Sequence, residues 1–93
     1  MSNQEVRNYL KVFLKEKGVI KASLFGSFAR GDNTDSSDID IILQLSSEKN
    51  LFDLAEIKVD LEEKFNRKVD VLTYNSIHPY IKEEILREQE ILF

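Results

Sequence analysis

The segment Asp38–Leu45 limits the possible folds of this chain more than any other. It reads Asp-Ile-Asp-Ile-Ile-Leu-Gln-Leu, and its β-branched residues predict a central strand. Because side chains alternate between the two faces of a strand, Asp38 and Asp40 should point to one face and the isoleucines that follow each of them to the other. The sequence therefore predicts a sheet with one covered apolar face and with two carboxylates on the opposite face.

In three other parts of the chain, the apolar residues have the spacing of a helix. The first is Asn3–Lys17, with Ser2 or Asn3 as a cap at its start and Gly18 after its end. The second begins at Asn50 and ends near Asn66. A last helix should start at Pro79. Its inward-facing residues are expected to be Ile81, Ile85 and Leu86.

Two further strands are predicted beside the central one. Val19–Phe25 is short and apolar and is broken by Gly26, and Lys68–Thr73 follows the second helix. The tail Ile91–Phe93 is apolar enough for a short edge strand. This order of elements predicts an α/β (α+β) fold, in which a small mixed β-sheet has its helices on one face. With 93 residues, the chain is too short for two cores, so residues 1–93 should form a single domain.

Composition excludes several classes of function. The chain has no Cys and a single His, His78, which rules out zinc fingers, iron-sulfur sites and thiol catalysis, so any metal must be bound by oxygen. His78, just before Pro79, is expected at a helix start or on the surface rather than in catalysis. The net charge of −4 is unfavourable for binding duplex nucleic acid. No apolar stretch could span a membrane, and the polar N-terminus does not resemble a leader, so we expect a cytoplasmic protein.

A third aspartate repeats the pattern of the central strand. Asp70 lies between Val69 and Val71 in the strand Lys68–Thr73. If this strand neighbours the central one, the carboxylates of Asp38, Asp40 and Asp70 converge. Oxygen ligands of this kind suit Mg²⁺, whose remaining positions are filled by water and phosphate. The structural alternative is that Asp38 ends a loop, Asp40 is solvated, and Asp70 pairs with Arg67 or Lys68.

A glycine-bounded hexapeptide, Gly26-Ser27-Phe28-Ala29-Arg30-Gly31, directly follows the first strand. Gly26 allows a sharp turn close to a ligand, Ser27 offers a hydroxyl and an amide, and Arg30 offers a fork of donors for phosphate. The spacing of the two glycines is that of a P-loop, but Asp32 and Asn33 stand where that motif requires Lys and Ser or Thr, which excludes it. Alternatively, Gly26 only ends the strand and Arg30 only bridges to a nearby Asp.

The hexapeptide, the Asp38-Ile39-Asp40 motif and the later Asp70 together resemble the nucleotidyltransferase superfamily typified by DNA polymerase beta. More closely, the chain is similar to the minimal nucleotidyltransferases, the MNT antitoxins encoded beside HEPN-domain toxins. The similarity covers nearly the whole chain, and no motif position departs from the family pattern.

The resemblance implies a role for each matched residue. Asp38, Asp40 and Asp70 would be the catalytic residues and would bind two Mg²⁺ ions, with Asp70 also accepting or relaying the proton of the attacking hydroxyl. Gly26 and Ser27 would bind the triphosphate of the nucleotide, and Arg30 would neutralise phosphate charge or hold the turn. These roles suit phosphoryl transfer, which depends mainly on positioning and on neutralising developing charge.

The implied activity is that of a Mg²⁺-dependent protein adenylyltransferase, an antitoxin that transfers AMP from ATP to a hydroxyl, expected to be a tyrosine, of a helical HEPN-type toxin. Toxin and antitoxin would then form a hetero-oligomer. A second hypothesis is a non-catalytic antitoxin that neutralises its partner by occlusion. A third, a transferase acting on small molecules, is disfavoured because such relatives carry an additional helical substrate domain, whereas this sequence ends at Phe93.

Overall fold

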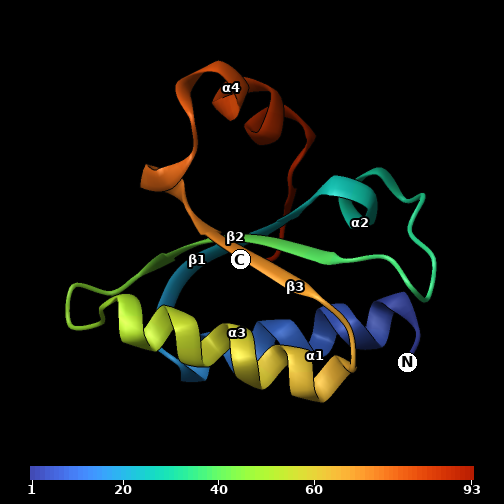
Figure 1. Cartoon of the computed structure of the whole chain (residues 1–93), viewed down its shortest axis with the longest axis horizontal. Coiled ribbons are helices and arrows are strands. Elements are labelled where there is room, and N and C mark those ends of the chain that lie inside the picture. The colour runs from blue at the N-terminus through green and yellow to red at the C-terminus, as the bar shows by residue number, and fades with distance from the viewer.

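The computed structural model describes all residues from Met1 to Phe93 and contains one mixed four-stranded sheet (Figure 1). The strand order is β3-β2-β1-β4. The strands are β1 (Val19–Phe25), β2 (Ile39–Leu45), β3 (Val69–Thr73) and β4 (Glu90–Ile91). Strand β1 is antiparallel to both β2 and β4, whereas β2 and β3 run parallel. The predicted mixed sheet and α+β class are confirmed.

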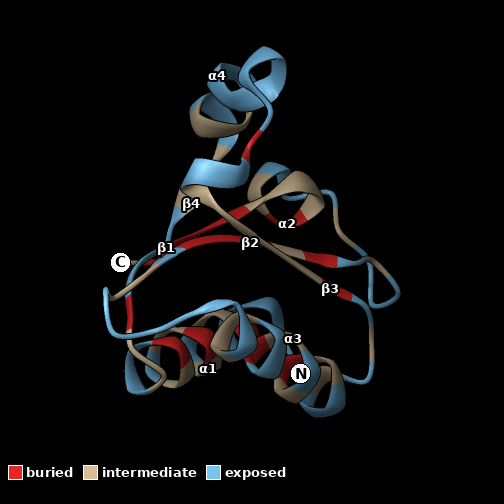
Figure 2. Ribbon diagram, turned by 60° about the vertical axis from the view of Figure 1, so that its left-hand side comes forward, coloured by how far each residue is buried: buried red, intermediate tan, exposed pale blue.

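Helices α1 (Asn3–Glu16) and α3 (Leu51–Phe65) cover one face of this sheet (Figures 1 and 2). Both begin with a capping box, in which Ser2 and Asn50 accept hydrogen bonds from the first turn of their helices. Asn66 ends α3 in the left-handed conformation, at φ 52°. The predicted starts and ends of these helices are therefore confirmed to within a residue or two.

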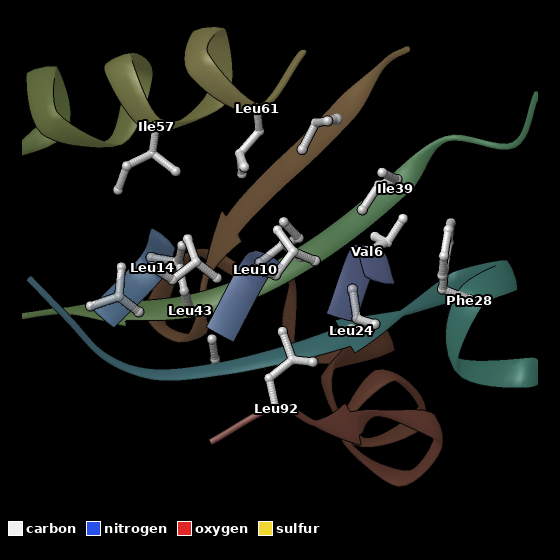
Figure 3. Close-up of a cluster of buried hydrophobic side chains, with 14 residues drawn as sticks. Val6, Leu10, Leu14, Leu24, Phe28, Ile39, Leu43, Ile57, Leu61 and Leu92 are labelled. Carbon is white, nitrogen blue, oxygen red and sulfur yellow. The ribbon is translucent and has the colours of Figure 1, made fainter. Parts of the chain in front are cut away.

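The main core lies between these two helices and the sheet (Figure 3). Leu10 and Leu14 of α1, Leu24 of β1, and Ile57 and Leu61 of α3 all belong to this core, and all five are at most 1% exposed. Ile39, Ile41 and Leu43 of β2 belong to the same cluster. The alternation predicted for the central strand is thus observed on its apolar side.

The opposite face of the sheet carries α2 (Gly26–Arg30), the short 3-10 helix η1 (Tyr74–Ser76) and α4 (Pro79–Glu88) (Figure 2). Part of this face is covered, since Ile42 and Ile77 are buried outside the main cluster. The Tyr74 hydroxyl also forms a hydrogen bond of 3.1 Å with the buried Ser23 hydroxyl of β1.

The last helix differs from the prediction. Helix α4 has no buried residue; Ile81 is 47% exposed, and Ile85 and Leu86 are only half-buried. The expectation that all helices share one face was wrong for α2 and α4, because α1 and α3 already fill the core face of the sheet. An amphipathic pattern shows that a helix has an apolar side, but not which surface that side meets.

No helix in this structure combines the length and the apolar character that a membrane-spanning segment requires.

Candidate functional site

The aspartates lie where the parallel strands β2 and β3 run side by side. Asp40 and Asp70 are direct partners in the register of these strands, so both side chains share a face. That face is the one opposite α1 and α3, because the neighbouring Ile39, Ile41 and Val69 point into the main core. Asp38 comes directly before β2. The prediction that the two strands are neighbours is confirmed.

Lys68 lies between two of the three carboxylates. Its Nζ is 3.9 Å from Asp38 Oδ2 and 3.8 Å from Asp70 Oδ1. The alternative in which Asp70 pairs with a neighbouring basic residue is therefore observed for Lys68. It does not hold for Arg67, whose Nη1 donates instead to the backbone carbonyl of Asp35 at 2.7 Å. The Lys68 side chain is 61% exposed, so it can leave this position without unpacking the core.

Asp40 has the most perturbed electrostatic environment of the three. The pKa of Asp40 is raised to about 6. Partial burial contributes most to this rise, followed by the hydrogen bond and charge of the adjacent Asp70 carboxyl and by the charge of Asp38, whereas Lys68 acts in the opposite direction. The pKa of Asp40 thus reflects first its burial and then the neighbouring carboxylates, whose effect Lys68 does not offset.

Gly26 brings the hexapeptide to these carboxylates. Phe25 is the register partner of Asp40 across β1 and β2, and the chain turns immediately afterwards at Gly26, with φ +68°. A Cβ atom at Gly26 would overlap Asp40 Oδ2. Only glycine therefore satisfies both the backbone conformation and the space left beside Asp40.

The two other predicted phosphate-binding residues lie on the same short helix. Ser27 is half-buried, and its hydroxyl has no hydrogen-bond partner within the chain, although its carbonyl accepts from the amides of Gly31 and Asp32. The Arg30 side chain is 50% exposed and donates to Asp32 at 3.2 Å. Arg30 and Gly26 also line a pocket of about 240 Å³ between α2 and α4. Ser27 and Arg30 thus belong to the short helix whose first residue packs against Asp40, and the Arg30 side chain is accessible to solvent.

The carboxylates of the site are ligands of the type that Mg²⁺ prefers, but their present positions do not form a metal site. No three acidic or imidazole side chains are arranged to bind one metal ion together. Asp40 and Asp70 nevertheless form an adjacent pair of oxygen donors, and an ammonium group already stands between Asp38 and Asp70. A hard cation that replaced the exposed Lys68 side chain would meet carboxylates only, which is the ligand type Mg²⁺ prefers.

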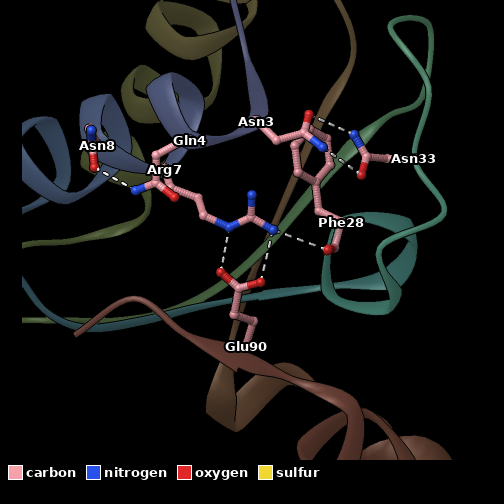
Figure 4. Close-up of polar contacts among 7 residues, drawn as sticks. All are labelled: Asn3, Gln4, Arg7, Asn8, Phe28, Asn33 and Glu90. Atoms are coloured by element: carbon pink, nitrogen blue, oxygen red, sulfur yellow. Dashed lines mark hydrogen bonds and ion pairs between the residues drawn. The ribbon is translucent and has the colours of Figure 1, made fainter.

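Two contacts near the site were not found from the sequence. One is the close approach of Gly26 to Asp40. The other is the ion pair of Arg7 with Glu90, beside the Phe28 carbonyl of α2 (Figure 4). The two charged residues are 83 positions apart, and no local pattern links them.

Comparison with known proteins agrees with this arrangement. Residues 8–93 match the family model described as polymerase beta, nucleotidyltransferase. The chain is 46% identical over 88 residues to MJ0435 of Methanocaldococcus jannaschii, a provisionally assigned protein adenylyltransferase, and the match covers 95% of each chain. It is also 29% identical over 89 residues to the protein adenylyltransferase MntA of Thermococcus cleftensis, covering 91% of this chain and 90% of that one.

Solved structures show the same fold. One, assigned provisionally as a minimal nucleotidyltransferase, superposes with a TM-score of 0.81 at 27% identity and covers 97% of this chain and 95% of that one. An MNT antitoxin solved in complex with a tri-AMPylated HEPN toxin of Shewanella oneidensis has a TM-score of 0.77 at 18% identity, over 99% of this chain and 72% of that one. Because the family model spans nearly all of the sequence and the fold agrees, the chain belongs to the polymerase beta nucleotidyltransferase family and is a minimal nucleotidyltransferase.

Proposed function

We propose that this nucleotidyltransferase transfers AMP from ATP to a hydroxyl of a HEPN-type toxin, with tyrosine as the acceptor, and thereby acts as the antitoxin of the pair. The observation that carries the proposal is the packing of Gly26 against the Asp40 carboxylate, with Asp70 as the register partner of Asp40. It sets the turn that we propose to bind phosphate next to a carboxylate pair. The names of the relatives support protein adenylylation as the reaction.

In this proposal the residues of the hexapeptide bind the nucleotide. Gly26 leaves room for the triphosphate to approach the backbone, the Ser27 hydroxyl and amide donate to it, and Arg30 exchanges Asp32 for a phosphate oxygen. Asp38, Asp40 and Asp70 would hold Mg²⁺, with two ions expected. When bound, the metal neutralises charge that develops on the attacking and leaving oxygens.

The proposed step is an in-line displacement at the α-phosphorus. A bond forms between the acceptor oxygen and the α-phosphorus, and the bond from this phosphorus to the bridging oxygen of pyrophosphate breaks. Pyrophosphate leaves with the electron pair of that bond, and the proton of the acceptor hydroxyl passes to the Asp70 carboxylate. Asp70 can play this part because its side chain is 39% exposed, on the face that an acceptor would approach.

The acceptor would come from a separate, helical protein that docks over the aspartate face and forms a hetero-oligomer with this chain. Such docking would exclude water, which otherwise competes for the activated phosphate. Residues 1–93 would act as one nucleotidyltransferase domain, and a cytoplasmic location remains a prediction.

Mass spectrometry of a toxin co-expressed with this chain tests the proposal. We expect adenylylated toxin with the wild-type chain and with the control Asp60→Asn, whose carboxylate lies on α3 near Lys17. We expect unmodified toxin with the double variant Asp38→Asn/Asp40→Asn. If the wild-type chain and the double variant neutralised the toxin equally and neither modified it, the result would favour occlusion. Occlusion does not need free carboxylates, so it is compatible with the position of Lys68 between Asp38 and Asp70.

A further inference from the structure

Arg7 lies at the junction of three elements (Figure 4). From α1, its Nε and Nη2 donate to the two carboxylate oxygens of Glu90, the first residue of β4, with Nη2 2.9 Å from Oε1. The same Nη2 also donates to the backbone carbonyl of Phe28 in α2, at 3.4 Å. The Arg7 side chain is 18% exposed, so this guanidinium is largely removed from water.

The two helices beside this junction bury few side chains of their own, although Phe28 belongs to the main core and Glu90 pairs with Leu24 of β1. Helix α2 contains a single buried residue, Phe28, and α4 contains none. Glu90 follows the end of α4 by only two residues. Arg7 therefore attaches both the backbone of α2 and the C-terminal end of α4 to α1, which packs firmly in the main core.

This attachment acts on the walls of the candidate site. Helices α2 and α4 lie against each other, and the pocket between them is lined by Gly26 and Arg30 on one side and by Ile81 and Ile85 on the other. Gly26 also packs against the Asp40 carboxylate. A shift of α2 would consequently move the proposed phosphate donors relative to the aspartates.

We propose that Arg7 is a positioning residue, which holds α2 in register with Asp40 through its bond to the Phe28 carbonyl and fixes the end of α4 through Glu90. This inference rests on the proposed function, since it assigns Arg7 to the same nucleotide site. The exposed pair of Arg87 and Glu83 on α4 is 3.8 Å apart, with side chains 72% and 90% exposed. Arg87 has no ion pair with Glu90, so this pair serves as the comparison, because such exposed pairs contribute little.

The Arg7→Met and Arg7→Lys variants separate positioning from stability. Arg7→Met removes both contacts, so we expect a lower Tm and a KM for ATP raised by about 10-fold or more, because small misplacements at a reacting centre are costly. In Arg7→Lys the ammonium can still pair with Glu90, but it lacks the rigid, planar fork of nitrogens that holds Glu90 and the Phe28 carbonyl in one fixed geometry. We therefore expect Arg7→Lys to recover most of the Tm while its KM stays raised. Arg87→Met, the control, should change neither quantity.

Amide hydrogen exchange gives a readout that needs no activity. The amides of Gly31 and Asp32 donate to the Ser27 carbonyl at 2.9 and 3.1 Å, so they report on α2. We expect faster exchange at both amides in Arg7→Met and Arg7→Lys, with the amides of β2 unchanged. A KM that recovers in Arg7→Lys together with the Tm, or α2 amides that exchange as in the wild type, would overturn the proposal. A wild-type chain without transferase activity would instead contradict the proposed function, and exchange would still decide the role of Arg7.

Discussion

Gly26 and Gly31 have the same backbone requirement but different surroundings. Both adopt positive φ, at +68° and +81°. A Cβ at Gly26 meets the Asp40 carboxylate, whereas a Cβ at Gly31 has no heavy atom within 4 Å. The two positions therefore allow backbone strain to be separated from disturbance of the aspartates.

We expect Gly26→Ala to abolish transfer and Gly31→Ala to retain most of it. Each substitution should lower the free energy of unfolding by about 1–2 kcal/mol, because an L-residue in this conformation is strained. Only Gly26→Ala also forces the Asp40 carboxylate to move. Urea denaturation measures the first effect and the adenylylation assay the second. Equal residual activity in the two variants would show that the space beside Asp40 is not required.

Asp40 should make stability fall as the pH rises. Its pKa is raised from 3.8 to about 6 in the folded chain, so between these values the folded state binds more protons than the unfolded state, and the free energy of unfolding decreases with increasing pH. With solvent screening of a half-buried group, we expect Asp40→Asn to be more stable than the wild type by about 1 kcal/mol at pH 7. The difference should shrink as the pH falls toward 4. Chemical denaturation of both proteins across this range tests it, and a pH-independent difference would contradict it.

At the scale of elements, the link from α3 to β3 depends on one left-handed residue. Asn66 has φ 52° and is the only residue other than glycine with positive φ. It ends α3 three residues before the strand that carries Asp70. The placement of Asp70 beside Asp40 therefore depends on the conformation of Asn66.

We expect Asn66→Gly to keep the free energy of unfolding within about 0.5 kcal/mol of the wild type, because glycine adopts this conformation freely. Asn66→Ala should lower it by about 1 kcal/mol, since the Cβ is crowded there. Urea titrations of the two variants provide the measurement. If both variants were equally destabilised, the Asn66 side chain, rather than its backbone conformation, would be the important feature.

For the molecule as a whole, stability and the candidate site lie on opposite faces of the sheet. Leu10 of α1 is fully buried in the main core, whereas Ile81 of α4 is 47% exposed. We expect Leu10→Ala to lower the free energy of unfolding by about 2–5 kcal/mol and Ile81→Ala by under about 1 kcal/mol. Thermal unfolding distinguishes the two. Comparable losses would mean that α4 belongs to the same cooperative core as α1.

The sequence by itself determined the elements whose signals are local. Helical spacing with Ser2 and Asn50 as caps located α1 and α3, and the alternation after Asp38 identified β2 together with the face of its carboxylates. The mixed α+β class followed from the order of these elements. Each of these features depends on residues a few positions apart, where periodicity and capping preferences apply directly.

Only the tertiary structure decided which surfaces meet. The amphipathic pattern of α4 did not reveal that α1 and α3 leave no room on the core face, so Ile81 was assigned to the wrong surroundings. The overlap of a Gly26 Cβ with Asp40 and the ion pair of Arg7 with Glu90 join segments that no local pattern relates. Such contacts depend on the order of the strands and on how the connections run between them, because this topology, and not any local pattern, decides which distant segments become neighbours.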